Sequence, residues 1–180
     1  IPAAGTLEEC WELLEAVKSA GTQYMLAENY VYMREHMIIR ELVERGYLGE
    51  LYYAEGEYVH DAKGGMYGAH GEPTWRREWF VGRKGANYAT HALGPVLNWM
   101  DERVATVSGF GSGRRNVPEH VMDDSTLMLA TTPSGKLIKV RNDLLSSGPP
   151  RKSFVLQGTA GVYEGSRRTV WGADGSVSTY

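Results

Sequence analysis

The spacing of apolar residues near the start of the chain predicts an amphipathic helix over residues 6–20. Thr6 and Glu9 have the spacing of a capping box at its beginning, and Gly21 is placed to end it. The apolar face consists of Leu7, Cys10, Leu13, Leu14 and Val17. Cys10 is therefore predicted to be a small core residue.

The same helical period predicts two further helices. The first covers residues 33–45 and ends at Gly46, with Glu41 and Arg45 spaced to form an i,i+4 ion pair. Its inward residues are Met37, Ile38, Leu42 and Val43. The second lies within residues 87–100, where Leu93, Val96, Leu97 and Met100 form the apolar stripe. Because proline is tolerated in the first turn of a helix, Pro95 indicates that Tyr88 and His91 lie at or just before the helix start.

Most other apolar patterns are those of strands. Residues 24–27 are entirely apolar, as in a strand buried on both faces, and residues 50–60 alternate as in a half-buried strand. Further strands are predicted at 105–110, 125–132, 136–143 and 152–158, followed by short hairpin pieces. A turn at 133–135 joins two of them, so their pairing is antiparallel.

These elements predict an α+β protein in which the end of a Rossmann α/β domain precedes a large, mostly antiparallel open sheet with flanking helices. Residues 1–30 are interpreted as the last helix and strand of a truncated Rossmann nucleotide-binding domain. Residues 31–180 are interpreted as a C-terminal α+β substrate and oligomerisation domain. The chain is read as a fragment, since it opens on Ile1 and closes on a strand pattern.

Composition narrows the class of partner. With 19 basic and 22 acidic residues the formal charge is −3, and the basic pairs are scattered, which argues against a nucleic-acid partner. No apolar run approaches the ~20 residues that cross a bilayer. A single cysteine excludes an intrachain disulfide. We expect a cytoplasmic protein without a membrane partner.

Several patterns indicate chemistry without specifying it. The glycine-rich stretch at 109–113 has Arg114 where a dinucleotide fingerprint needs its third glycine, and no helix follows. His60, Asp61 and His70 have suitable metal-binding groups but no recognised ligand spacing, so no metal site is predicted. A Ser-His-Asp triad stays open, although no G-x-S-x-G elbow is present. Residues 61–86 form a long loop that carries Trp75 and Arg76, and its length favours a functional role.

Six stretches together give the chain a family resemblance. They are IPAAGTLEE (1–9), YMLAENYVY (24–32), LGELYYAEGEYVHD (48–61), TWR (74–76), YATHALGPV (88–96) and LQGTAGVYE (156–164). In this order the chain resembles the Gfo/Idh/MocA family of NAD(P)-dependent oxidoreductases over nearly its whole length. The resemblance implies a two-domain enzyme whose sheet domain carries the substrate pocket and, through the open sheet, a homo-oligomer interface.

The resemblance also implies roles for particular residues. His91 would be the acid/base residue, and NAD or NADP would be the cofactor. Residues expected to bind the cofactor are Pro2, Glu28, Asn29, Trp75 and Arg76, and those expected to bind substrate are His60, Asn87 and Arg76. Glu28 and Asn29 would lie at a strand end, where open α/β sheets bind ligands.

Two departures from the family pattern affect the chemistry. Ile1 stands where family dehydrogenases have the lysine of a Glu-Lys-Pro motif, and Asn87 stands where they have an aspartate four residues before the histidine. Asparagine orients an imidazole but supplies no charge. The pattern Tyr88-x-x-His91-Ala-Leu-Gly-Pro95 resembles the NAD-dependent family 109 glycosidases. In that branch His91 and a tyrosine, Tyr32 or Tyr88, would share the proton transfers.

The sequence therefore supports three hypotheses. The first is the C-terminal part of an NAD(P)-dependent oxidoreductase acting on a sugar, cyclitol or polyol hydroxyl, with the redox-assisted glycosidase as its sharper form. The second is a non-catalytic sugar-binding or oligomerisation scaffold. The third, ranked last, is a metal-dependent hydrolase that uses His60, Asp61, His70 or His91.

Overall fold

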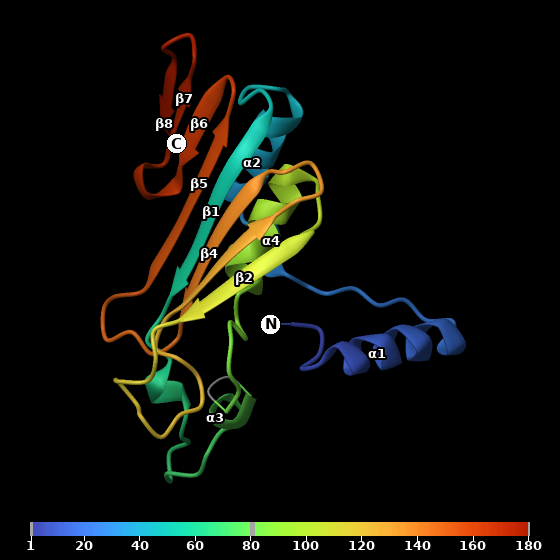
Figure 1. The fold of residues 1–180 in the computed structure, drawn as a ribbon, viewed down its shortest axis with the longest axis vertical. Coiled ribbons are helices and arrows are strands. Elements are labelled where there is room, and N and C mark those ends of the chain that lie inside the picture. The colour runs from blue at the N-terminus through green and yellow to red at the C-terminus, as the bar shows by residue number, and fades with distance from the viewer. Residues whose placement is uncertain (1, 80–81, 180) are drawn as a thin grey trace.

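The computed structural model describes residues 2–79 and 82–179 and is built around an eight-stranded sheet (Figure 1). The strands follow one another across the sheet in the order β2-β3-β4-β1-β5-β6-β7-β8. Their bounds are β1 Leu51–Val59, β2 Thr106–Gly111, β3 Thr126–Thr131, β4 Leu137–Asp143, β5 Arg151–Gly158, β6 Gly161–Glu164, β7 Thr169–Gly172 and β8 Val177–Thr179. Neighbouring strands are antiparallel except β1 and β4, which are parallel. The predicted open, mostly antiparallel sheet is confirmed.

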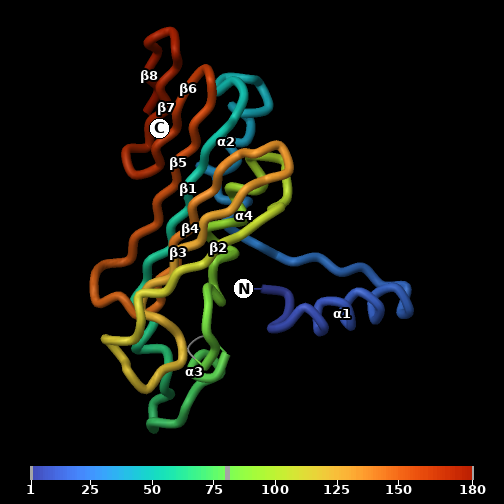
Figure 2. The backbone as a smooth tube through the Cα atoms, viewed as in Figure 1, coloured from blue at the N-terminus to red at the C-terminus, as the bar shows by residue number. Residues whose placement is uncertain are grey.

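Two of the described α-helices, the second and the fourth along the chain, cover one face of this sheet. The helices are α1 Leu7–Ala20, α2 Arg34–Glu44, α3 Trp75–Trp79 and α4 Thr90–Met100, with short 3₁₀ turns η1 Asn29–Tyr32, η2 Lys63–Gly65 and η3 Gly165–Arg167. α4 packs on β1, β4 and β5, and α2 packs against α4 (Figures 1 and 2). Within the described residues, no helix combines the length and apolar content needed to cross a bilayer. The three long helices predicted from the sequence are present as α1, α2 and α4.

The start of α4 is held very close to the sheet. Gly56 in β1 has no side chain, and a Cβ built there would lie 2.1 Å from the carbonyl oxygen of Ala92. Ala92 itself is fully buried. At the other end of α4, the Trp99 indole N–H donates to the His36 carbonyl of α2 at 2.9 Å. These contacts fix the height of the helix above the strand that lies beneath it.

We expect Gly56→Ala to lower the free energy of unfolding by about 1–3 kcal/mol, because backbone must move to admit the methyl group. Gly109→Ala in β2 is the matched control, since a Cβ there meets nothing within 4 Å. Urea unfolding of both variants measures the difference. Equal losses would show that strand glycines, and not the approach of α4, account for the effect.

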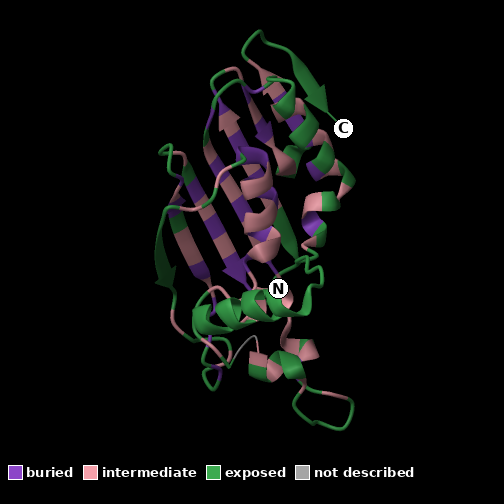
Figure 3. Ribbon diagram, turned by 90° about the vertical axis from the view of Figure 1, so that its right-hand side faces the viewer, coloured by how far each residue is buried: buried purple, intermediate pink, exposed green. Residues whose placement is uncertain are grey.

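The apolar face of α1 has no cover in this structure. The helix begins with the predicted capping box, but Trp11 is 59% exposed and Cys10 is exposed. No residue of α1 is buried (Figure 3). The prediction of Cys10 as a core residue is wrong here, because no other described element packs on that face. The strand predicted at 24–27 is also absent, and Met25 is 71% exposed. A strand needs a hydrogen-bonded neighbour, and the described chain supplies none at this place.

Three local predictions need correction. In α2 the buried residues are His36 and Ile39, whereas Met37 is 53% exposed, so the inward face is rotated from the predicted one. Pro95 is the sixth residue of α4 and lies beyond the first turn. The long loop of residues 61–86 contains η2 and α3. The periodic pattern located α2 and α4 along the chain. It did not fix which face of each helix is buried, because partly buried residues lie on both sides of each apolar stripe.

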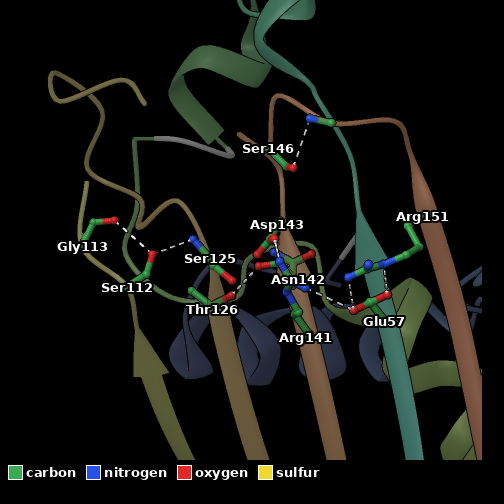
Figure 4. Close-up of polar contacts among 11 residues, drawn as sticks. Glu57, Ser112, Gly113, Ser125, Thr126, Arg141, Asn142, Asp143, Ser146 and Arg151 are labelled. Atoms are coloured by element: carbon green, nitrogen blue, oxygen red, sulfur yellow. Dashed lines mark hydrogen bonds and ion pairs between the residues drawn. The ribbon is translucent and has the colours of Figure 1, made fainter. Parts of the chain in front are cut away.

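The opposite face of the sheet carries charged pairs at its centre. Glu55 pairs with Lys139. Glu57 pairs with Arg141 and Arg151 (Figure 4). Exposed apolar residues flank these pairs on both sides, namely Phe110, Leu129, Leu137 and Val177. The face is mixed in character and is not covered by the helices (Figure 1).

Candidate active site

His91 is the second residue of α4, so its side chain lies at the end of the helix where backbone N–H groups point outward. Its Nδ1 lies 2.7 Å from Glu28 Oε1, and its Nε2 lies 3.3 Å from the Tyr88 hydroxyl. The two partners of the ion pair are mostly buried, with side chains 12% and 10% exposed. Both ring nitrogens of His91 therefore have defined neighbours.

Glu28 supplies the carboxylate that Asn87 does not. It caps η1, where its Oε1 accepts the Tyr30 N–H at 3.0 Å. Burial acts to raise the pKa of Glu28, but the hydrogen bonds from His91 and the Tyr30 amide outweigh it and leave the pKa below its ordinary value. The carboxylate is consequently ionised near neutral pH. A carboxylate–imidazole pair is present, with the carboxylate 63 positions away in sequence.

Gly94 makes room for this carboxylate. A Cβ at position 94 would lie 2.7 Å from Glu28 Cγ. Gly94 sits one turn after His91 in α4, so the glycine and the histidine present one surface to the segment that carries Glu28. The packing of Glu28 thus explains why a glycine stands at position 94.

Three tyrosines surround the imidazole. Tyr30 stacks on His91 with ring centroids 4.3 Å apart, Tyr58 is tilted against it at 5.3 Å, and Tyr88 meets it edge-on at 4.9 Å. Burial, more than the neighbouring Tyr88, raises the pKa of Tyr30 to about 12. Burial and then the neighbouring Tyr30 raise the pKa of Tyr58 to about 12. These phenols are neutral at physiological pH and can donate or share a proton.

Sequence reasoning did not identify Tyr30 or Tyr58 as site residues. Tyr32, which it chose, is 65% exposed and lines a surface groove along α2 with Met37 and Ile38. The 3₁₀ turn explains the difference, because it buries Tyr30 and directs Tyr32 outward. For Tyr58 a signal did exist, since it is the last tyrosine of the alternating strand β1, which ends at Val59 just before His60.

The remaining nominated residues lie around this cluster. The His60 ring meets Tyr58 edge-on at 6.1 Å, and its backbone N–H donates to Asp143 at 2.8 Å. The Asn87 amide donates to the Arg83 carbonyl at 3.0 Å. Arg76 stacks on Trp75 at 4.7 Å, and its charge acts to lower the pKa of Tyr88, which burial nevertheless raises.

The other nominated cofactor residues differ in exposure. Asn29 is exposed beside Glu28, and Pro2 is half-buried. Among the described residues, no group of three or more His, Cys, Asp or Glu side chains is arranged to hold a metal ion. The structure therefore gathers Glu28, Tyr88 and His91 into one contact network, with His60 reaching it through Tyr58.

The chain matches a protein family model over most of its length. Residues 36–164 match the model of the GFO/IDH/MocA C-terminal domain. An alpha-N-acetylgalactosaminidase of Shewanella oneidensis and a glycosyl hydrolase family 109 protein of Shewanella putrefaciens are each 30% identical over 92% of the chain. The chain spans 40% of the length of these relatives.

Solved structures share the fold at lower identity. A levoglucosan dehydrogenase in complex with NADH and levoglucosan matches 94% of the chain and 48% of its own, with a TM-score of 0.72 and 22% identity. An oxidoreductase from Agrobacterium radiobacter in complex with NAD+, L-tartaric acid and magnesium matches 98% and 52%, with a TM-score of 0.72 and 18% identity. An NAD-binding oxidoreductase from Klebsiella pneumoniae matches 91% and 46%, with a TM-score of 0.69 and 20% identity.

Proposed function

This chain belongs to the Gfo/Idh/MocA family, and on that basis we propose that it forms the C-terminal part of an NAD(P)-dependent oxidoreductase acting on a hydroxyl of a sugar, cyclitol or polyol. The observation that carries the proposal is the buried contact of 2.7 Å between Glu28 and His91. A carboxylate on one imidazole nitrogen leaves the other nitrogen to work as an acid or base. We assign that role to His91.

In this proposal, the protons move on the chain's own residues. With Nδ1 protonated and donating to Glu28, the Nε2 of His91 accepts the proton of the substrate hydroxyl. The ionised Glu28 stabilises the imidazolium that forms, as a carboxylate does for histidine in other acid–base pairs. Tyr88, 3.3 Å from Nε2, orients the hydroxyl or relays its proton. When bound, NAD(P) supplies the acceptor for the hydride that leaves the carbon bearing this hydroxyl.

The residues present fit the nicotinamide end of such a cofactor. Glu28 contacts His91, and the adjacent Asn29 is exposed with an amide able to donate and accept hydrogen bonds. Trp75 and Arg76 would approach from the loop, and Pro2 from the N-terminal segment. We assign residues 1–30 to a nucleotide-binding domain, because the exposed apolar face of α1 needs a covering layer.

A redox-assisted glycosidase is the second candidate, and the three tyrosines around His91 favour it. Elimination of a glycosidic leaving group removes a further proton, from carbon, and delivers a proton to the departing oxygen. In this second candidate His91 takes up the proton from carbon. Tyr58 and Tyr88, neutral phenols in contact with His91, donate the proton to the departing oxygen in preference to the exposed Tyr32. The alpha-N-acetylgalactosaminidase relative supports this reading.

We also propose that the uncovered sheet face forms a homo-oligomer interface, because it combines exposed apolar residues with intramolecular charge pairs. A scaffold without turnover is the alternative that would retain this interface. It predicts an oligomer that binds sugar but never changes it.

Turnover by the full-length protein tests the proposal. We would add NAD+ or NADP+ with a panel of sugars, cyclitols and polyols and follow reduced nicotinamide by its absorbance. In parallel, an aryl α-N-acetylgalactosaminide would report leaving-group release without net reduction. Reduction supports the dehydrogenase and release supports the glycosidase. Sugar binding without either reaction would leave only the scaffold.

Gly94→Ala should separate activity from stability. Alanine is the better helix former by about 1 kcal/mol, which offsets much of the loss of about 1–3 kcal/mol from the broken contacts of Glu28, so the free energy of unfolding should fall by no more than about 2 kcal/mol. The new methyl group displaces Glu28, however, and turnover should fall about 10- to 100-fold. Urea unfolding and steady-state kinetics measure the two effects. Unchanged turnover would show that the contact of Glu28 with His91 is not needed.

A further inference from the structure

The helix-facing surface of the sheet changes from apolar to polar at the level where α4 begins. Two transverse rows are almost entirely apolar, namely Ala130–Ile138–Ala54–Leu156 and Met128–Val140–Gly56–Phe154. The next row, on the same face, is Thr126–Asn142–Tyr58–Lys152. We call these four residues the polar row. Because its members are neighbours in the strand register, their positions are set by the sheet itself.

Asn142 is a buried polar member of this row. Its side chain is 1% exposed, and neither its amide nitrogen nor its oxygen has a hydrogen-bond partner among the described residues. Leaving such a group unsatisfied costs about 1–3 kcal/mol. The Thr126 hydroxyl donates to the Asn142 backbone carbonyl at 2.9 Å, so this bond does not satisfy the side-chain amide of Asn142 (Figure 4). A costly residue at this position favours a functional explanation for the row.

Lys152 places an uncompensated positive charge at the end of the row. Its Nζ lies 4.8 Å from the ring centroid of Tyr30 and 5.8 Å from that of Tyr58. No carboxylate among the described residues pairs with it, whereas Arg151 next to it and Lys139 both form ion pairs. The tyrosine faces hold an ammonium group weakly and do not neutralise its charge.

His91 and Lys152 share the same two rings as neighbours. Tyr30 stacks on His91 and has Lys152 over its ring, and Tyr58 is likewise in contact with both. A sugar-sized molecule whose hydroxyl reaches His91 therefore has a substituent within reach of the ammonium group. Arg76 is a second cation near Tyr88. Burial raises the pKa of Tyr88, and the charges of Arg76 and Lys152 both act to lower it.

We propose that Lys152 binds an anionic substituent, a carboxylate or a phosphate, of the sugar whose hydroxyl contacts His91. This inference rests on the proposed function for the position of the hydroxyl, but it adds the class of substrate. An ammonium group is a compact charge that binds such anions through charge-assisted hydrogen bonds. The site would thus select a sugar acid or a sugar phosphate over the neutral sugar.

Calorimetric titration of the full-length protein, with NAD(H) present, tests the proposal. The probes are D-glucuronate and D-glucose 6-phosphate, each compared with D-glucose at constant ionic strength. We expect at least one anionic probe to bind about 10-fold more tightly than glucose or better. Lys152→Met should reduce this advantage to less than about 2-fold, and Lys152→Arg should keep most of it. The anionic probe that binds more tightly shows whether the ligand group is a carboxylate or a phosphate.

Lys18→Met is the matched control, because it removes the same charge from α1, where Lys18 already pairs with Glu15. It should leave the advantage intact. Equal binding of glucose and both anions, binding of none of them, or an unchanged advantage in Lys152→Met would each overturn the proposal. Retained anion selectivity without any NAD-linked turnover would instead overturn the proposed function and leave the Lys152 site standing.

Discussion

Replacing His91 with asparagine should lower turnover by the full-length protein about 10²- to 10⁴-fold, the range typical of losing a general acid–base residue. The imidazole touches Glu28 through Nδ1 and Tyr88 through Nε2, a pair of contacts that no other histidine in the described part of the chain makes. Asparagine retains a polar group of similar reach but cannot accept a proton. Steady-state kinetics with the preferred substrate, together with cofactor binding by fluorescence, measure the effect.

The variant should still bind the cofactor, because His91 is assigned to the proton and not to the nucleotide. His70→Asn is the matched control, since His70 lies on an exposed loop. Its turnover should stay within about 2-fold of wild type, as for most surface changes. An active His91→Asn enzyme would remove the histidine from the mechanism. A large loss in His70→Asn would revive the metal-dependent alternative.

Glu28→Gln should lower turnover on the order of 10²-fold and change its pH dependence. Glutamine keeps the shape of the side chain but removes the charge that stabilises protonated His91. The folded-state pKa of Glu28 lies below its ordinary value, so its stabilising contribution is present above the unfolded-state pKa. That contribution is lost as the pH falls through the lower, folded-state pKa.

Urea unfolding at several pH values checks this sign. The free energy of unfolding of wild type should exceed that of Glu28→Gln by about 1–3 kcal/mol near pH 7, and the difference should shrink on acidification below pH 5. Glu55→Gln, on the opposite face of the sheet, is a comparison that should leave turnover unchanged. A difference that grows as the pH falls would contradict the assignment of an ionised Glu28.

The sequence predicted the elements well because each has a strong local signal. The stripe ending at Met100 places α4, and alternation along 50–60 places β1. His91 was expected at or just before a helix start from the position of Pro95, and it lies in the first turn although Pro95 lies beyond it. The same local signals do not predict which other segment packs on a helix or pairs with a strand. The apolar stripe of α1 is real, yet it is exposed here, and residues 24–27 find no neighbouring strand.

The key contact of the site had no local signal. Glu28 and His91 are 63 positions apart, and the sequence suggested the cofactor as the partner of Glu28. Only the packing of η1 on α4, allowed by Gly94, brings the carboxylate to the imidazole. The same holds for Lys152, whose position depends on the register of β5 against β1. Contacts between distant segments are decided by tertiary packing, which periodicity does not report.

The most direct test is whether the full-length protein holds a nicotinamide cofactor. We would purify it without added cofactor, denature it, and assay the released NAD(H) and NADP(H), then titrate the native protein with each. The account predicts either stoichiometric retained cofactor, as an internally recycled glycosidase would need, or saturable binding, as a dehydrogenase would need. A protein that neither retains nor binds a nicotinamide cofactor would contradict the account and leave the scaffold.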